Sequence, residues 1–310
     1  MQQLPDKFKK LVLPLLYVTL LLLLVYTFIH YRILMTGSLL FTAREEWLDL
    51  FVPLGLSAIL VLTVIRPRIR LLKLTTRKGS AEFLYIFLAI LVMAAPVMIA
   101  QSYMVSDTGK LTDMEDVRDI TRLPPTLYYT MKHYFIDKDQ VGIYKGTRVS
   151  GRYNSQLDLL MYLAVPVFPE AGDTNQSNTV GWIGIHYIKT ISNHQSGQAK
   201  LEEKNAFFEK SWRDFLASDL QHFAYLRRVV PNMISDRYLY AEQNSDKQYY
   251  AGSPFILEEI YQPFSGRNGN KPLWLLVSLI LGFGVWTLVV GLRAFKKDPE
   301  TLLYPELADY

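Results

Sequence analysis

The chain has no cysteine among its 310 residues. This absence excludes disulfide bonds, thiolate metal sites and cysteine nucleophiles. Histidine is also sparse, because the five histidines lie far apart and none belongs to a His-x-His or His-x-x-x-His pair. Metal ligands normally recur at such short spacings. We therefore expect no metal site, and nothing in the sequence implies a cofactor.

Glycine-rich loops of the kind that bind phosphate are missing as well. Such a loop needs its glycines at the start of a helix. Gly181 and Gly184 instead lie in a strand-like pattern, and Gly282 and Gly284 lie in an apolar run. Residues 265–271 are rich in glycine and asparagine, and we interpret them as a structural turn. The alternative is a loop that docks a peptide or a lipid headgroup.

Four long runs have almost no charge: residues 11–29, 48–65, 83–104 and 273–292. A helix needs about 20 apolar residues to cross about 30 Å of hydrocarbon. The sequence therefore predicts four transmembrane helices. The first run is too long for a signal peptide and lacks a small-residue cleavage site, so we interpret it as a retained anchor. Pro14, Pro53 and Pro96 interrupt these runs and predict local kinks.

Basic residues are concentrated beside the apolar runs. The connection after the second run contains six of them and no acidic residue: Arg66, Arg68, Arg70, Lys73, Arg77 and Lys78. Short basic loops remain on the cytoplasmic side, and the segments before residue 11 and after residue 292 are also basic. We therefore expect a multi-pass protein of a bacterial inner membrane with both termini cytoplasmic. The alternative role of the six residues is to bind anionic lipid headgroups, at about 1 kcal/mol each.

The polar block between the third and fourth runs has a balanced charge. Residues 105–271 contain 19 lysines and arginines and 20 acidic residues, whereas the rest of the chain has 14 and 9. Nucleic-acid-binding domains carry a dominant basic face, so we expect no nucleic-acid partner. The expected partners are membrane lipids and membrane or envelope proteins, and the block is predicted to be extracytoplasmic.

Alternating patterns in this block predict an inserted α+β domain with a mostly antiparallel sheet and one main covering helix. The predicted strands are residues 127–136, 141–150, 158–168, 180–192, 221–230 and 255–261. The main helix is predicted at residues 201–220, and a short helix capped by Ser235 at residues 235–244. Residues 106–112 are expected to form a turn. The predicted organisation is thus residues 1–104 with three spans, the domain at 105–271, and 272–310 with the fourth span and a tail.

Ser57 is the one serine that invites a catalytic interpretation, because it lies inside the second span, two residues after Gly55. A serine nucleophile needs a base within hydrogen-bonding distance, and His30, at the outer end of the first span, is the weak candidate. We expect instead that Ser57 is a packing residue whose hydroxyl bonds its own helix backbone. The sequence contains no complete set of catalytic residues, so we do not favour the hypothesis that the protein is an enzyme.

Four stretches together resemble a known family: TGKLT at 108–112, YTMKHYFIDK at 129–138, GIHYIKTISN at 184–193 and RNGNK at 267–271. They are similar to the membrane-anchored N-terminal region of bacterial rhomboid-family intramembrane serine proteases. The resemblance extends nearly to Lys297, and it implies a longer protein in which a catalytic core follows. The family's Gly-x-Ser-Gly serine and its histidine have no match here, because Ala58 follows Ser57.

The leading hypothesis is therefore a non-catalytic, membrane-anchored module whose extracytoplasmic domain binds proteins. The resemblance implies an accessory or substrate-docking region of a rhomboid-like protease. One alternative is an intramembrane serine hydrolase that uses Ser57 with His30. Another alternative is an envelope sensor or assembly subunit, which would need a cytoplasmic partner.

The predicted orientation can be tested with single cysteines in this cysteine-free chain. Ser245→Cys is expected to react with a membrane-impermeant thiol reagent in intact cells, because residue 245 lies in the predicted outer domain. Thr76→Cys is expected to react only after the membrane is permeabilised. The opposite labelling pattern would invert the orientation.

Overall fold

We analysed a computed structural model that describes residues 4–32, 41, 43–76, 79–172, 181–245 and 255–296. The chain folds into two compact units. The helical unit comprises residues 1–108 and 268–310, and the sheet unit comprises Gly109–Arg267. The sheet unit starts and ends inside the predicted block 105–271.

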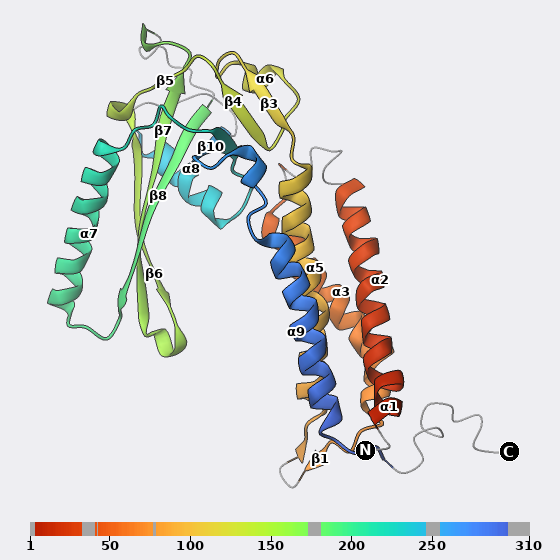
Figure 1. Cartoon of the computed structure of the whole chain (residues 1–310). Coiled ribbons are helices and arrows are strands. Elements are labelled where there is room, and N and C mark those ends of the chain that lie inside the picture. Colours follow the sequence, from red (N-terminus) through yellow and green to blue (C-terminus); the bar gives the residue numbers. More distant parts are fainter. Residues whose placement is uncertain are drawn as a thin grey trace. The chain divides into compact units, whose positions relative to one another are not determined.

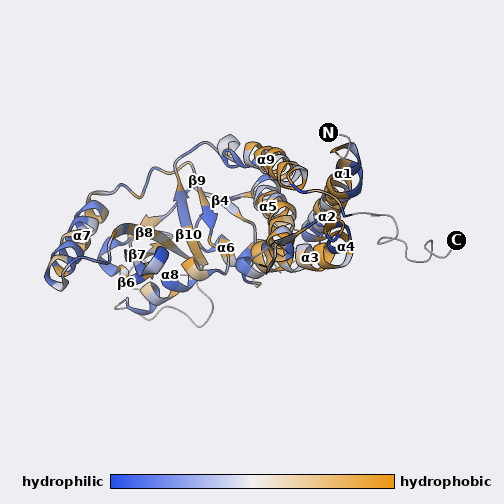
Figure 2. Ribbon diagram, turned by 90° about the horizontal axis from the view of Figure 1, so that it is seen from below, coloured by the Kyte–Doolittle hydropathy of each residue, from blue (hydrophilic) through white to orange (hydrophobic). Residues whose placement is uncertain are grey.

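The helical unit contains four helices that are long and apolar enough to cross a membrane: Leu4–His30, Trp47–Ile69, Glu82–Thr108 and Phe264–Gly291. These contain the four apolar runs found in the sequence, except for the last residue of the fourth run, so the prediction of four such helices is confirmed. The hydropathy colours of Figure 2 show their apolar character along α2 (Leu13–His30), α5 (Glu82–Thr108) and α9 (Lys271–Gly291). Burial of facing apolar side chains, among them Leu15, Val97 and Trp286, holds the helices together.

Three wide π-helical turns adapt these helices to proline. Each ends two residues before one: η1 (Phe8–Val12) before Pro14, η4 (Trp47–Phe51) before Pro53, and η5 (Val61–Ile65) before Pro67. Proline has no N–H to donate, and its ring collides with the carbonyl four residues earlier. A π turn moves the hydrogen bond to the carbonyl five residues back and relieves that collision. Pro96, in contrast, lies inside the continuous helix α5.

One end of the helical unit joins segments that are far apart in the sequence. The Lys7 ammonium donates to the Gly291 carbonyl at 2.9 Å. The Lys73 backbone N–H donates to the Ala294 carbonyl, also at 2.9 Å. The N-terminal segment, the connection that follows the second helix and the segment after α9 therefore meet at this end. These are the segments in which the basic residues are concentrated.

The described part of the sheet unit forms an eight-stranded, mostly antiparallel sheet (Figure 1). Its order is β3-β4-β9-β10-β8-β7-β5, and β6 also pairs with β7. The strands are β3 (Leu111–Met114), β4 (Tyr128–Met131), β5 (Phe135–Ile136), β6 (Gly142–Ser150), β7 (Gln156–Phe168), β8 (Gly181–Ser192), β9 (Tyr225–Arg228) and β10 (Phe255–Ile260). Only the β3–β4 and β8–β10 pairs are parallel, which confirms the predicted antiparallel character.

Strand β7 is buried on both faces of the sheet. Alternate residues such as Leu159 and Leu163 pack with Phe215 of α7 (Gly197–Ala217). The intervening residues, such as Tyr162, pack with Tyr238 of α8 (Met233–Gln243). A strand covered on both faces reads as a continuous apolar run. The expectation of one main covering helix was therefore wrong, because α8 covers the second face.

Two parts of the sheet differ from the prediction. Residues 127–136, predicted as one strand, form β4 and β5, which pair with different neighbours, β9 and β7. Residues 106–112, predicted as a turn, contain the end of α5 and the start of β3. The division of residues 127–136 comes from long-range pairing, which local sequence pattern does not encode.

The start of α8 also differs from the prediction. Its N-cap is Asn232 rather than Ser235. The Asn232 side chain accepts from the N–H groups of Ile234 and Ser235, each at 2.8 Å. The Ser235 hydroxyl in turn accepts from the Asn232 N–H at 2.9 Å. This reciprocal capping box satisfies N–H groups that the first helical turn would otherwise leave unpaired.

Phe215 and Leu216 offer a matched test of the core under α7. Phe215 is 0% exposed and packs against Trp212 in a tilted arrangement, with 5.3 Å between ring centroids, whereas the Leu216 residue is 53% exposed. Phe215→Ala is expected to lower the free energy of unfolding of the sheet unit by about 3–5 kcal/mol. Leu216→Ala should change it by less than about 0.5 kcal/mol. Hydrogen exchange of the β7 and β8 amides in the full chain measures both, and equal effects would contradict this account.

Candidate functional site

The structure does not join Ser57 to His30. The Ser57 side chain lies in α3 (Val52–Leu60) and is fully buried, and its hydroxyl has no hydrogen-bond partner among the described residues. The expected bond to its own helix backbone is therefore absent. A hydroxyl without a neighbouring base is not activated as a nucleophile.

His30 instead connects the first two long helices. Its Nε2 lies 3.2 Å from Oδ1 of Asp49, in η4. One turn earlier on α2, the Tyr26 hydroxyl donates to the Leu48 carbonyl at 2.6 Å. Both contacts tie the end of α2 to the start of the second helix. His30 thus has a structural role here rather than that of a base for Ser57.

The six basic residues predicted for topology or lipid binding have several different partners. Arg66 and Arg70 both donate to Oε1 of Glu82 through Nε, at 2.8 and 3.2 Å. Arg68 donates to the carbonyl of Val64. Lys73 is exposed, and Arg77 and Lys78 lie outside the described residues. Exposed ion pairs contribute little stability, so the pairing with Glu82 mainly orients the short helix α4 (Arg66–Ile69) beside α5.

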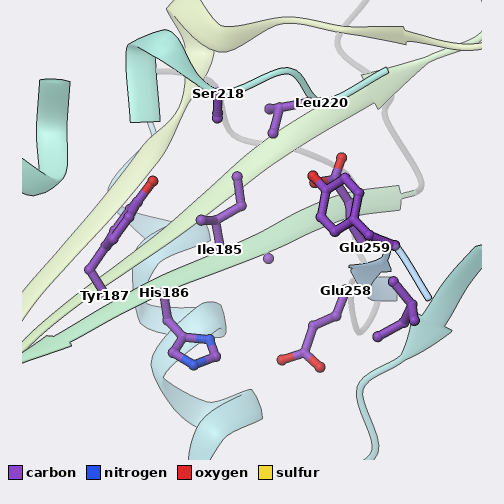
Figure 3. A pocket seen from close by; sticks show the side chains of 10 residues that line it. Ile185, His186, Tyr187, Ser218, Leu220, Glu258 and Glu259 are labelled. Atoms are coloured by element: carbon purple, nitrogen blue, oxygen red, sulfur yellow. The ribbon is translucent and has the colours of Figure 1, made fainter. Parts of the chain in front are cut away.

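The sheet unit contains a cavity that the sequence analysis missed. Strands β8 and β10 pair at only three positions, from Gly181↔Phe255 to Ile183↔Leu257. Beyond these, β10 stays paired with β9 and β8 stays paired with β7. The two strands separate, and a cavity of about 420 Å³ lies between them (Figure 3). Its lining residues are Gly184, Ile185, His186, Tyr187, Ser218, Leu220, Glu258, Glu259, Ile260 and Tyr261.

One face of this cavity is closed by a hydrogen-bonded network around Tyr238. A Cβ atom at Gly184 would lie 2.9 Å from Cε1 of Tyr238, so glycine is what lets this ring pack against β8. The Tyr238 hydroxyl lies 2.8 Å from Nδ1 of His186 and donates to Oε1 of Glu258 at 3.3 Å. Arg227 donates to Oε2 of Glu258 at 2.6 Å. The Glu258 carboxylate is therefore fully paired, and Tyr238 bridges the two separating strands.

Glu259 lies on the opposite face and is only half paired. Side chains alternate along a strand, so Glu259 shares the face of Leu257, a core residue. Its Oε2 accepts from the Tyr261 hydroxyl at 2.7 Å, whereas its Oε1 is buried without a partner in the described part of the chain. Burial raises the pKa of the Glu259 carboxyl. A carboxyl group with a raised pKa and an unpaired oxygen beside a cavity is a candidate functional residue.

The charges nearest Glu259 act in opposite directions, and neither has as large an effect on its pKa as burial. The Asp219 carboxylate also raises the pKa of Glu259, and the Lys138 ammonium opposes this rise only weakly compared with burial. Lys138 is engaged elsewhere, because it donates to the carbonyls of Phe215 and Leu216 at 3.1 and 3.2 Å at the end of α7. Glu259 is therefore the charged side chain that lines the cavity on this face.

One signal in the sequence points to this site. Glu258 and Glu259 are consecutive inside a predicted strand, so one of the two must face the core. That a cavity lies beside them depends on the separation of β8 from β10, which no local pattern shows. Among the described residues, no group of three or more histidine and acidic side chains is arranged to hold a metal ion.

Comparisons with known proteins give no match. No family model matches the chain, and neither a curated protein nor a solved structure is significantly similar to it.

The pKa shifts of Glu259 and Asp158 have opposite directions, so they predict opposite effects of pH on the stability of the fold. Because the folded-state pKa of Glu259 is raised, its ionisation destabilises the fold as pH rises above the unfolded-state pKa. Glu259→Gln is therefore expected to raise the thermal midpoint at neutral pH. This gain should shrink at acid pH, where the wild-type carboxyl is protonated.

Asp158 provides the control of opposite sign. The Thr190 hydroxyl, at 2.7 Å, and Arg148 hold its pKa below the usual range. Its ionised form therefore stabilises the fold above the unfolded-state pKa, and this stability is lost as pH falls through the folded pKa. Asp158→Asn should lower the midpoint at neutral pH. Calorimetry of the full chain in detergent tests both, and a lowered midpoint for Glu259→Gln at neutral pH would contradict the assignment.

Proposed function

We propose that this protein is a membrane-anchored, non-catalytic binding module whose sheet unit takes up an extended polypeptide segment. The segment would add as a strand to the open edge of β8. Main-chain hydrogen bonds supply much of the affinity in this mode of recognition, and alternate side chains supply the specificity. The observation that carries the proposal is the early separation of β10 from β8.

The open edge is long. Strand β8 pairs with β7 along its whole length, from Gly181↔Val167 to Ser192↔Gln156. On its other side it pairs with β10 only as far as Ile183. Over residues 184–192 this second edge has no partner strand among the described residues. Unpaired strand edges are templates for pairing with another chain, and this one leads directly into the cavity at Glu259.

The four apolar helices support the membrane anchor. They have the length and composition to span a bilayer, and the basic segments meet at one end of the helical unit. By the positive-inside rule we assign that end to the cytoplasm of a bacterial cell. The sheet unit, which follows Thr108 and precedes Asn268, is then extracytoplasmic. Lys73, Arg77 and Lys78 remain candidates for contacts with anionic lipid headgroups.

The resemblance to the N-terminal region of rhomboid-family proteases suggests a class of partner. A docking module beside such a protease would bind substrate segments in an extended form. In this proposal the strand-adding edge of β8 performs the docking, and the hydrolysis takes place elsewhere, because Ser57 and His30 do not form a catalytic pair.

Hydrogen exchange on the full chain in lipid nanodiscs tests strand addition. The probe is a pool of blocked octapeptides with randomised sequence. At a pool concentration of about ten times its Kd, alternate amides of residues 184–192 are expected to exchange about tenfold more slowly. The edge strand β6 should show no such change.

A matched pair of photo-crosslinking variants gives the spatial control. Ile188 on β8 and Val149 on β6 are both 50% exposed. Benzoylphenylalanine at position 188 is expected to crosslink the peptide pool, and the same group at position 149 is not. Equal crosslinking at both positions, together with unprotected β8 amides, would refute strand addition.

A further inference from the structure

The cavity between β8 and β10 combines three kinds of surface. Ile185 and Leu220 provide apolar walls, Tyr187 and Tyr261 provide aromatic rings, and Glu259 provides a carboxylate. Its volume of about 420 Å³ falls within the range of sites for small ligands, about 300–1,000 Å³. A single long side chain that is apolar along its stem and polar at its tip matches these surfaces.

The two carboxyl groups that line the cavity differ in their hydrogen-bond partners. Glu258 is paired with Arg227 and Tyr238 on one face of the sheet. On the other face, Glu259 receives one hydrogen bond, from Tyr261, and its Oε1 atom is buried without a partner in the described residues. A carboxylate oxygen only accepts hydrogen bonds. The missing partner is therefore a hydrogen-bond donor, and a cationic donor also neutralises the buried charge.

The added strand would bring a side chain to this position. Neighbouring strands lie about 4.8 Å apart and direct alternate side chains to opposite faces of the sheet. On β8, Ile185 and Tyr187 share the face that packs against α7, and Figure 3 shows them on the side opposite His186. Alternate side chains of a segment paired with this stretch would point to the same face, into the cavity next to Glu259.

We propose that the cavity is a specificity pocket for a lysine or arginine side chain of the bound segment, with the Glu259 carboxylate as its charge partner. The alkyl stem lies between Ile185 and Leu220. The ammonium or guanidinium group donates to Oε1 of Glu259 and lies near the Tyr187 and Tyr261 rings, which favour cations electrostatically. This inference rests on the proposed binding of an extended segment and names what that segment carries.

An anionic or neutral guest fits the site less well. An acidic side chain would face Glu259 and the nearby Asp219, and like charges repel each other. An apolar side chain would leave the buried Oε1 atom unpaired, with the desolvation penalty that this entails. A cation removes both problems. The destabilising carboxylate thus has a function in binding that it lacks in folding.

The test uses four octapeptide pools that differ only at one central position, which is arginine, lysine, citrulline or glutamate. Citrulline has nearly the same shape as arginine but no charge. Binding to the full chain in nanodiscs is measured by fluorescence anisotropy. The arginine and lysine pools are expected to bind about tenfold more tightly than the citrulline pool, the effect of one charge-assisted contact. The glutamate pool should bind most weakly.

Two glutamine variants identify the responsible carboxylate. Glu259→Gln is expected to remove the preference for arginine over citrulline while the protein stays folded. Glu242→Gln is the matched control, because burial also raises the pKa of Glu242, which lies on α8 and does not line the cavity. It should leave the preference unchanged. Equal binding of the arginine and citrulline pools to the wild type would overturn the proposal.

A small probe separates this inference from the proposed function. If every pool protects the β8 amides equally, strand addition stands and the cationic pocket is refuted. If n-butylguanidinium binds in a Glu259-dependent way but no pool protects β8, the cation site stands and strand addition is refuted. If neither probe binds, both are refuted.

Discussion

The antiparallel ladder between β7 and β8 is the interaction on which the sheet unit depends. It joins twelve positions without a break, from Gln156↔Ser192 to Val167↔Gly181, and it lies between the apolar faces of α7 and α8. Strand β10 pairs with β9 over residues 257–260. Strands β8 and β10 pair with each other at only three positions. The cavity lies where the β7–β8 pair and the β9–β10 pair separate.

The two faces of that opening are built differently. On the α8 face, Tyr238 bridges His186 and Glu258, and Arg227 neutralises the carboxylate, so this face forms a rigid and satisfied network. On the α7 face, Glu259 is held by one hydrogen bond and has an unpaired buried oxygen. Burial raises the pKa of this carboxyl, so its ionised form destabilises the fold. The hydrogen bonds of Glu258 are complete and those of Glu259 are not, so Glu259 is the carboxyl group to which a ligand would donate.

In the helical unit, polar side chains form pairs that hold neighbouring segments together. His30 and Asp49 pair with each other at the ends of adjacent helices, and Arg66 and Arg70 share Glu82. Pro14, Pro53 and Pro67 are each preceded by a π turn, which shifts the hydrogen bond that the proline would break. Ser57 differs from these, because its buried hydroxyl lacks a partner among the described residues. It is isolated from any base, so its surroundings do not provide the chemistry of a nucleophile.

The sequence by itself determined the four apolar helices and the mostly antiparallel sheet, because both depend on local composition and periodicity. It also showed the approximate positions of β6, β7, β8, α7 and β10. Only the tertiary structure decided that residues 127–136 divide between two strand neighbours, that Asn232 caps α8, and that this helix covers the second face of β7. It alone placed Glu259 beside a cavity. The physical reason is that pairing partners and the separation of strands are set by contacts between distant segments, whereas the sequence pattern reports only which face of an element is apolar.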